Sequence, residues 1–483
     1  MKPLLATRLS VRQLLIFPLC LAGAVGLSGC LDSSSSSSGA PDPVLPPGGP
    51  TTPELPADVL RPLVFVHGTA GSASQYQTQA MRFDSNGYSA DYVSAFEYST
   101  NGLPIILAAR DGALSEALDE HIERVLAEHN SDKVNIACHS LGTAVCGHYL
   151  NDQQRAAKVN AYVALDGAGG TGPDTTCPGE EGWRAPCLGI FVDPERTIGP
   201  NNVHLPDETH VQAATSAASF AAQFEFFTGE EPTTTDIVVE EGEVAISGRA
   251  VYFPANEGAN GSTLRVWEID SDTGERLANE PLDSFAIDAT GEWGPVDLVT
   301  GAHYEFELQR PGRATHHFYR QPFLRASELV RFNTSAAGSE IETNTNSGPE
   351  HAALVISRDL EWYVDNGEQT DILEISTVSP LQGDQPAFNL ITPEMGNGNI
   401  GIHVHDDVAT PRETTGALLA YFHAQIFQTG ADVFMPGDPD PDGYISIVSS
   451  PRGDTERKQQ LNVPNWASSE HRISLTFNDF VQD

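Results

Sequence analysis

The chain has 483 residues and carries 66 acidic against 26 basic side chains, which gives a formal net charge of −40 at pH 7. This length exceeds what one hydrophobic core supports, so two or three domains are expected. A surface this acidic repels phosphate backbones and anionic lipid headgroups, which argues against nucleic acid as a partner. The same charge is typical of proteins from saline habitats and of acidic extracellular proteins.

The N-terminal segment predicts export followed by lipid anchoring. Basic residues precede the apolar run LLIFPLCLAGAVGL, which suits the core of a signal peptide over residues 1–29. The run ends in LSGC, which resembles the bacterial lipobox, so Cys30 is the expected site of lipid attachment. Residue 31 is Leu rather than Asp, and by resemblance to the sorting rules of bacterial lipoproteins this points to the outer membrane. An ordinary signal peptide cleaved nearby is the alternative.

Residues 30–58 are rich in serine and then in proline, a composition that cannot bury a core and predicts a tether. The membrane is therefore expected to be contacted through the lipid anchor only. The protein would sit on the periplasmic face or on the cell surface, with release into the medium as a further option. The oligomeric state is left open.

Residues 59–231 alternate short apolar strands with segments of helical period. The strands include PLVFVHG, KVNIAC, NAYVALDG and CLGIFVD, and a last helix is expected to end near Gly229. This alternation predicts an α/β domain with a mostly parallel sheet and helices on both faces.

The first strand runs into a loop of small residues, TAGSAS, about seventy residues before a second motif. Ester hydrolysis needs two backbone N–H groups aimed at the developing oxyanion, and one of them comes from such an early loop. Thr69 is the preferred donor, and Ala70 is the alternative.

The second motif, VNIACHSLGTAV, places Ser140 between an apolar strand and a helical segment. That is the context of a nucleophile elbow, where the serine hydroxyl projects from a sharp turn and the next residue, Leu141, supplies the second oxyanion N–H. Cys138 and Gly142 are the small residues that flank the serine, so the motif departs from G-x-S-x-G at its first position. An ordinary strand, serine N-cap and helix is the alternative.

The base and the acid are sought on loops after the later strands. His210 directly precedes the last helix and is the preferred base, whereas His204 lies in a strand-like segment that suits a structural role. Asp193 ends the strand CLGIFVD and is the preferred acid. Asp166, at the end of YVALDG, and Glu195 are the alternatives.

Four cysteines remain after the signal peptide and Cys30 are set aside. Cys177 and Cys187 flank a Gly/Pro-rich loop, and a disulfide between them is expected because export permits oxidation. Cys138 and Cys146 lie on either side of Ser140, and a bridge or two buried thiols are equally open. None of the four has the spacing of a metal site.

The C-terminal half is read as β-rich. Residues 232–331 alternate strands with polar turns at intervals typical of a sandwich-like module. Residues 332–483 are expected to form a second β-rich domain, although one continuous β domain is also open.

With oxyanion loop, nucleophile, acid and base in this order, residues 60–230 resemble bacterial lipases and carboxylesterases of the α/β-hydrolase superfamily. The resemblance implies an acyl-enzyme on Ser140, proton transfer by His210, an acid at Asp193, and no metal or organic cofactor. Lipids, short-chain esters and aliphatic polyesters are all open as substrates.

Two other functions remain as alternatives. An acyltransferase or thioesterase would use the same triad, and a surface-binding lipoprotein would carry an inactive hydrolase domain. Product analysis with alcohol acceptors tests the first alternative, and fluorophosphonate labelling of Ser140 tests the second.

Overall fold

The computed structural model describes residues 55–56, 59–364 and 369–481. The predicted signal peptide, the lipobox with Cys30 and almost all of the tether lie outside these residues. Within the described part of the chain, no helix is both long and apolar enough to cross a membrane.

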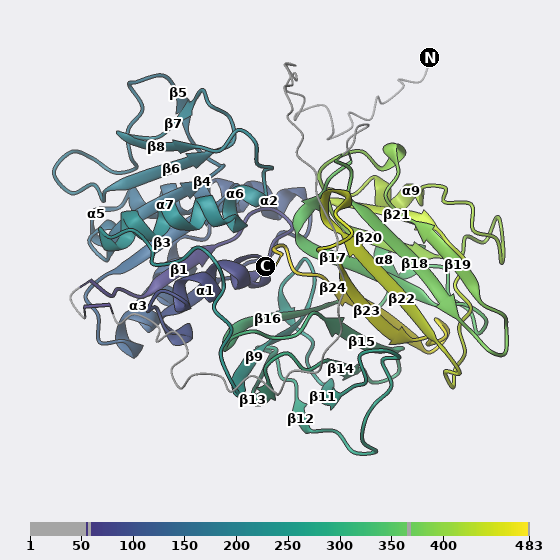
Figure 1. The fold of residues 1–483 in the computed structure, drawn as a ribbon. Helices are drawn as coiled ribbons and strands as arrows, with labels where there is room; N and C mark the ends of the chain where they lie inside the picture. The colour runs from purple at the N-terminus through teal and green to yellow at the C-terminus, as the bar shows by residue number, and fades with distance from the viewer. Residues whose placement is uncertain (1–54, 57–58, 365–368, 482–483) are drawn as a thin grey trace, which may run out of the picture. The chain divides into compact units, whose positions relative to one another are not determined.

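The N-terminal part is an α/β domain built on a six-stranded parallel sheet, in the order β2-β1-β3-β4-β6-β8 (Figure 1). Because the strands are parallel, their carboxyl ends share one edge of the sheet, where ligand sites of such folds form. The strands are β1 (Leu63–Val66), β2 (Val93–Phe96), β3 (Val134–His139), β4 (Val159–Leu165), β6 (Cys187–Phe191) and β8 (Asn201–His204).

Helices cover both faces of this sheet, as the alternation of the strand residues requires. In β1, Val64 and Val66 pack into the core beneath α2, α3 and α4, whereas Leu63 and Phe65 pack into the core beneath α1 and α7. These helices are α1 (Gln77–Asp84), α2 (Leu103–Arg110), α3 (Ser115–Glu128), α4 (Leu141–Leu150) and α7 (Ala217–Thr228), and the short helices are α5 (Gln153–Ala156) and α6 (Gln212–Thr215).

The last helical segment is divided at Ser216. The backbone of Ser216 is extended, and its hydroxyl accepts a hydrogen bond from the Ser219 N–H at 3.0 Å, so Ser216 caps α7 after α6 has ended. Gly229 stops α7 in the left-handed conformation, with φ of 79°, as its position in the sequence predicts.

Two disulfides staple the α/β domain. The expected bridge between Cys177 and Cys187 is confirmed. Cys138 is bonded to Cys146, which joins the end of β3 to α4 across the turn that carries Ser140. Of the two possibilities left open for Cys138 and Cys146, the structure therefore shows the disulfide and not two buried thiols.

The rest of the described chain is β-rich and contains three larger sheets. A four-stranded sheet holds β9 (Glu243–Tyr252), β10 (Glu257–Gly258), β13 (Glu292–Val299) and β16 (Ser327–Thr334). A second holds β18 (Ile372–Val378), β19 (Gln385–Asn389), β22 (Tyr444–Ser450) and β23 (Gln459–Pro464). The third has eight strands: β12 (Asp283–Ala286), β11 (Thr263–Glu268), β14 (Tyr304–Gln309), β15 (Thr315–Arg320), β24 (His471–Thr476), β17 (Ala353–Trp362), β20 (Asn399–His405) and β21 (Gln428–Asp432).

The eight-stranded sheet runs across the two predicted β modules. Strand β15 pairs in parallel with β24, so strands from both sequence ranges share one hydrogen-bonded ladder. The predicted boundary at residue 331 lies inside β16. The β-rich part nevertheless has two separate hydrophobic clusters. One is formed by residues before 340, and the other by residues 352–477 together with Ile269 and Tyr319.

Candidate active site

Ser140 sits at a sharp turn between β3 and α4. Its φ of 52° and ψ of −118° lie in a region that residues with a side chain rarely adopt, and such strain concentrates at functional sites. A Cβ at Gly142 would lie 2.4 Å from the Val66 carbonyl oxygen, and one at Gly68 would lie 2.8 Å from Ser140 Cβ. Both glycines are therefore required for strand, loop and helix to approach, as the elbow motif predicts.

The backbone around Ser140 provides N–H groups for an oxyanion. Leu141 is the first residue of α4, and the first N–H groups of a helix have no partner within it. On the facing loop, the Ala70 N–H donates to Thr100 Oγ1 at 3.1 Å, which leaves Thr69 as the better candidate of the two. Thr69 and Ser140 line the same cavity.

The carboxylate that bonds His210 is Asp166. His210 Nδ1–H donates to Asp166 Oδ2 at 2.6 Å, and Asp166 Oδ1 accepts the Val192 N–H at 3.2 Å. Burial acts to raise the pKa of Asp166, but the hydrogen bond from His210 and the charge of that imidazole bring it below its ordinary value. Asp166 is therefore held as a carboxylate that fixes the orientation of the His210 ring.

The preference for Asp193 as the acid is corrected. Asp193 Oδ1 accepts the N–H of Glu195 within its own turn at 2.9 Å, and Glu195 is exposed. The residue after β4, and not the turn after β6, reaches His210. His204 has the structural role expected of it, because its Nε2–H donates to the Arg196 carbonyl oxygen at 2.8 Å.

His139, the residue before the nucleophile, supports the backbone of His210. Its Nε2–H donates to the His210 carbonyl oxygen at 2.9 Å, and its Nδ1 accepts from Gln75 Nε2 at 3.0 Å. Burial lowers the pKa of His139 to about 3, with a smaller contribution from the charge of His210. His139 therefore stays neutral. The G-x-S-x-G pattern assigns no role to this position, so sequence reasoning missed the contact.

The loop that carries Thr69 is fixed through His67, a second buried histidine. His67 stacks on Tyr98 with ring centroids 4.3 Å apart, and its Nδ1–H donates to the Gly68 carbonyl oxygen at 2.8 Å. Burial lowers the pKa of His67, so its Nε2 is free to accept from the Tyr98 N–H at 3.2 Å and from Asn256 Nδ2 at 3.4 Å. Asn256 belongs to the β-rich part of the chain.

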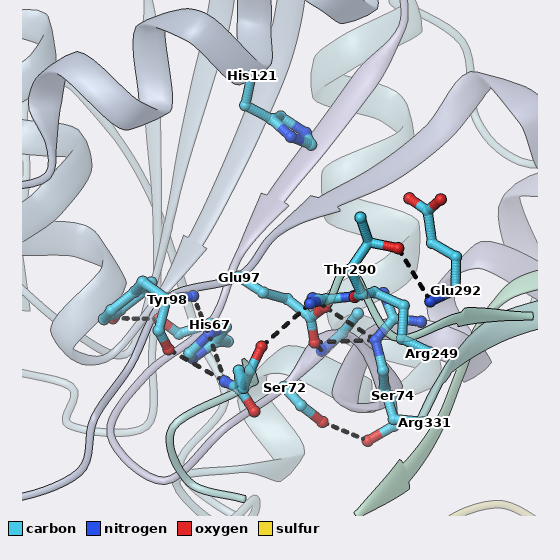
Figure 2. A network of polar contacts seen from close by, with 12 residues as sticks. His67, Ser72, Ser74, Glu97, Tyr98, His121, Arg249, Thr290, Glu292 and Arg331 are labelled. Atoms are coloured by element: carbon cyan, nitrogen blue, oxygen red, sulfur yellow. Dashed lines mark hydrogen bonds and ion pairs between the residues drawn. The ribbon is translucent and has the colours of Figure 1, made fainter. Parts of the chain in front are cut away.

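Figure 2 shows a second link from this loop to the β-rich part, centred on Glu97. Glu97 accepts the Ala73 N–H at 2.9 Å, Arg249 Nη1 at 2.7 Å and Arg331 Nε at 2.9 Å. Burial acts to raise the pKa of Glu97, but the charges of Arg331 and then Arg249 hold it below its ordinary value. One buried carboxylate thus joins the end of the loop to strands β9 and β16.

Ser140 and His210 open into one cavity of about 220 Å³. Much of its wall comes from the β-rich part, whose apolar contributions include Phe253, Phe318, Phe332, Ile400, Phe427 and Ile473. No local pattern places these residues near Ser140, because they lie more than a hundred residues away along the chain. The cavity is therefore suited to an apolar group next to Ser140.

Comparison with known families supports a lipolytic hydrolase. Residues 60–161, which include Ser140, match the model of class 2 lipases, and residues 242–337 match the model of the lipase C-terminal domain. These matches support a bacterial lipase. A third model, described as a C-terminal domain, matches residues 340–481. A search of curated proteins found no match.

Two of the solved structures that match the chain do so at low identity and low TM-score. The lin2722 product of Listeria innocua has 14% identity over 36% of this chain and 96% of its own, with a TM-score of 0.27. Lipase BlEst2 of Bacillus licheniformis, in its propeptide form, has 9% identity over 86% of this chain and 95% of its own, with a TM-score of 0.29. Likeness at these scores assigns no role to any residue.

Proposed function

We propose that the protein is a serine carboxylic-ester hydrolase of the α/β-hydrolase type. The observation that carries the proposal is that Ser140, on a strained strand-to-helix turn, shares a cavity with His210, whose other ring nitrogen is bonded to Asp166. This arrangement contains a nucleophile, a base and an orienting carboxylate in the roles that acyl transfer requires.

In the proposed reaction the Ser140 hydroxyl attacks the ester carbonyl carbon while His210 Nε2 takes the hydroxyl proton. The N–H groups of Leu141 and Thr69 donate to the oxyanion that develops. His210 then returns the proton to the leaving alcohol, and the acyl group stays on Ser140. Water, deprotonated by His210, attacks the acyl-enzyme and releases the carboxylic acid, which restores the serine.

The cavity favours esters with an apolar acyl group, since aromatic and aliphatic side chains of the β-rich part form much of its wall. The hydrogen bond from His210 to Asp166 would orient the imidazole before substrate arrives, and the network around Glu97 would hold the loop that carries Thr69. The proposed steps use only side-chain and backbone groups of this chain.

The test is hydrolysis of p-nitrophenyl esters from C2 to C16 in high salt by the unmutated protein and by Ser140→Ala. Activity in the first and a loss of at least about 10³-fold in the second are expected, because the acyl-enzyme cannot form. The chain-length profile then separates esterase from lipase. If both proteins hydrolyse the esters equally, or if neither does, Ser140 is not the nucleophile for such esters. The alternative of a surface-binding lipoprotein would then be favoured.

The predicted export signal adds a proposal about location. We propose that Cys30 is acylated and anchors the enzyme to the outer membrane through the tether of residues 30–58. Incorporation of labelled palmitate that is lost in Cys30→Ser is the expected result. Equal labelling of the two proteins would show that Cys30 is not the attachment site.

A further inference from the structure

The loop that carries His210 is held by a residue of the C-terminal region, Glu361. Glu361 lies near the end of β17, and its side chain is buried, with 5% of the residue exposed. Glu361 Oε1 accepts the Val211 N–H at 2.8 Å, and Glu361 Oε2 accepts the Thr209 hydroxyl. Both donors are immediate neighbours of His210 in the chain.

These two hydrogen bonds constrain the loop strongly. Hydrogen bonds to an ionised carboxylate are shorter and stronger than neutral ones, and a buried donor left without a partner costs free energy. With each carboxylate oxygen engaged by one flanking residue, the backbone on either side of His210 is held at one distance from β17. The position of the imidazole then depends on where β17 lies.

A second residue of the same region packs on the imidazole itself. The Phe427 ring lies nearly parallel to that of His210, with 10° between the planes and 6.2 Å between the centroids. Phe427 adopts a left-handed backbone conformation, with φ of 59°, and its carbonyl oxygen accepts the Ile400 N–H at 2.8 Å. The C-terminal region therefore contacts the residues on either side of His210 and the imidazole ring itself.

The α/β domain supplies the complementary contacts. Asp166 bonds Nδ1 of the imidazole, and His139 bonds the carbonyl oxygen of His210. Neither contact involves the backbone N–H of Val211 or the hydroxyl of Thr209, which are left to Glu361. The loop is thus shared between the domain that carries the nucleophile and the region matched by the C-terminal family model.

We propose that Glu361 is a positioning residue for His210, so that the C-terminal region is part of the catalytic apparatus. The inference rests on the proposed ester hydrolysis. A displacement of about 1 Å in a catalytic group is enough to lower a rate by up to 100-fold, so loss of one anchor of this loop should appear in kcat.

The main test is Glu361→Gln, compared with Glu307→Gln, in hydrolysis of p-nitrophenyl butyrate. Glutamine keeps the shape but turns one acceptor into an N–H₂ donor that faces another donor. We expect kcat to fall about tenfold with KM within about twofold, because the base is displaced while the cavity is kept. Glu307 is equally buried and accepts Trp267 Nε1–H at 3.0 Å away from the cavity, so its variant should keep kcat.

A second pair of variants covers the case in which Glu361→Gln does not fold. Thr209→Ser keeps the hydroxyl donor and Thr209→Val removes it with little change of shape. The valine variant should have about threefold lower kcat than the serine variant at the same melting temperature. Equal kcat in this pair would overturn the proposal.

The remaining outcomes separate this inference from the proposed function. If Ser140→Ala is inactive and Glu361→Gln keeps kcat within twofold of the unmutated protein, the positioning role fails and the hydrolase proposal stands. If Glu361→Gln and Glu307→Gln lose kcat equally, the effect is general destabilisation and the positioning role again fails. If Ser140→Ala is as active as the unmutated protein, the proposed function itself fails.

Discussion

Asp166 and Asp193 both follow strands at the carboxyl edge of the parallel sheet, and both precede His210 in the chain. Asp166 adopts a left-handed φ of 40° directly after β4, and its carboxylate reaches His210 from there. Asp193 lies within a turn, and its side chain accepts the Glu195 N–H of that turn. Position at the edge of a sheet is therefore not sufficient for the acid role, because the direction of the loop decides which carboxylate reaches the imidazole.

Replacing these two aspartates by asparagine distinguishes them. Asp166→Asn should lower kcat by about 10³-fold or more, because an amide favours the wrong tautomer of His210. Asp193→Asn should keep kcat within about twofold. The measurement is steady-state hydrolysis at saturating ester, with the folded state checked by circular dichroism. A large loss in Asp193→Asn with little loss in Asp166→Asn would reinstate Asp193 as the acid.

At the scale of elements, the turn between β3 and α4 depends on more than its glycines. The disulfide from Cys138 to Cys146 joins the end of β3 to α4, with Ser140 between the two cysteines in the sequence. The helix begins at Leu141 without a side-chain cap, so the disulfide is a covalent restraint where a cap is missing. The other bridge, Cys177 to Cys187, closes a loop of similar length away from the elbow.

The two disulfides make a matched pair for mutation. Replacing both cysteines of either bridge by alanine should cost about 2–3 kcal/mol of stability, since the sequence separations are 8 and 10. Only the Cys138/Cys146 double variant should also lower kcat, by about fivefold or more, because it releases the turn that aims Ser140. Thermal unfolding and ester hydrolysis of both variants measure this. Equal kcat in the two would show that the elbow does not need its bridge.

At the scale of the whole molecule, the β-rich part joins the α/β domain through buried charges. Arg249 and Arg331 meet Glu97, and Arg325 Nε donates to Asp84 Oδ2 at 2.6 Å. These pairs are less than a quarter exposed, so salt screens them weakly. The remaining excess of negative charge lies mainly on the surface, where screening acts fully.

We therefore expect salt to stabilise the protein. With a net charge of −40 the folded state repels itself, and the Debye length falls from roughly 10 Å at 0.1 M to roughly 3 Å at 1 M salt. The melting temperature should rise by about 5 °C over this range, which corresponds to roughly 4 kcal/mol for a chain of this size. Sucrose at matched osmolality is the control. An equal rise in sucrose, or none in salt, would contradict self-repulsion as the cause.

A buried carboxylate inside the eight-stranded sheet predicts a pH effect. Glu305 accepts Arg276 Nε at 2.8 Å and His317 Nδ1 at 2.5 Å. Burial acts to raise the pKa of Glu305, but these partners lower it from 4.5 to about 2. A depressed folded-state pKa gives stability that is present above 4.5 and is lost as the pH falls toward 2.

Glu305→Gln should remove this pH dependence. Between pH 4.5 and 2, the unmutated protein should lose about 3 kcal/mol more stability than the variant. Urea unfolding at a series of pH values measures the difference between the two proteins, in which the many other carboxylates cancel. A constant difference across this window would show that the pKa of Glu305 is not depressed.

Several features of this protein follow from the sequence alone because they are local. Apolar strands alternating with helical periods determine the α/β domain, and Gly229 determines where its last helix ends. The small residues around Ser140 mark the elbow, since only they allow strand and helix to touch. The position of His210 before the last helix identified the histidine that the structure brings to the cavity of Ser140.

The tertiary structure alone decided which distant groups meet these local features. The choice of Asp166 over Asp193 depends on the directions of two loops, and the anchoring of His210 by Glu361 depends on β17 lying against a loop 150 residues earlier in the chain. Composition and periodicity specify which face of a strand is buried, but they do not specify which separate element covers it. That choice is made by packing and by the pairing of buried polar groups, which are properties of the whole fold.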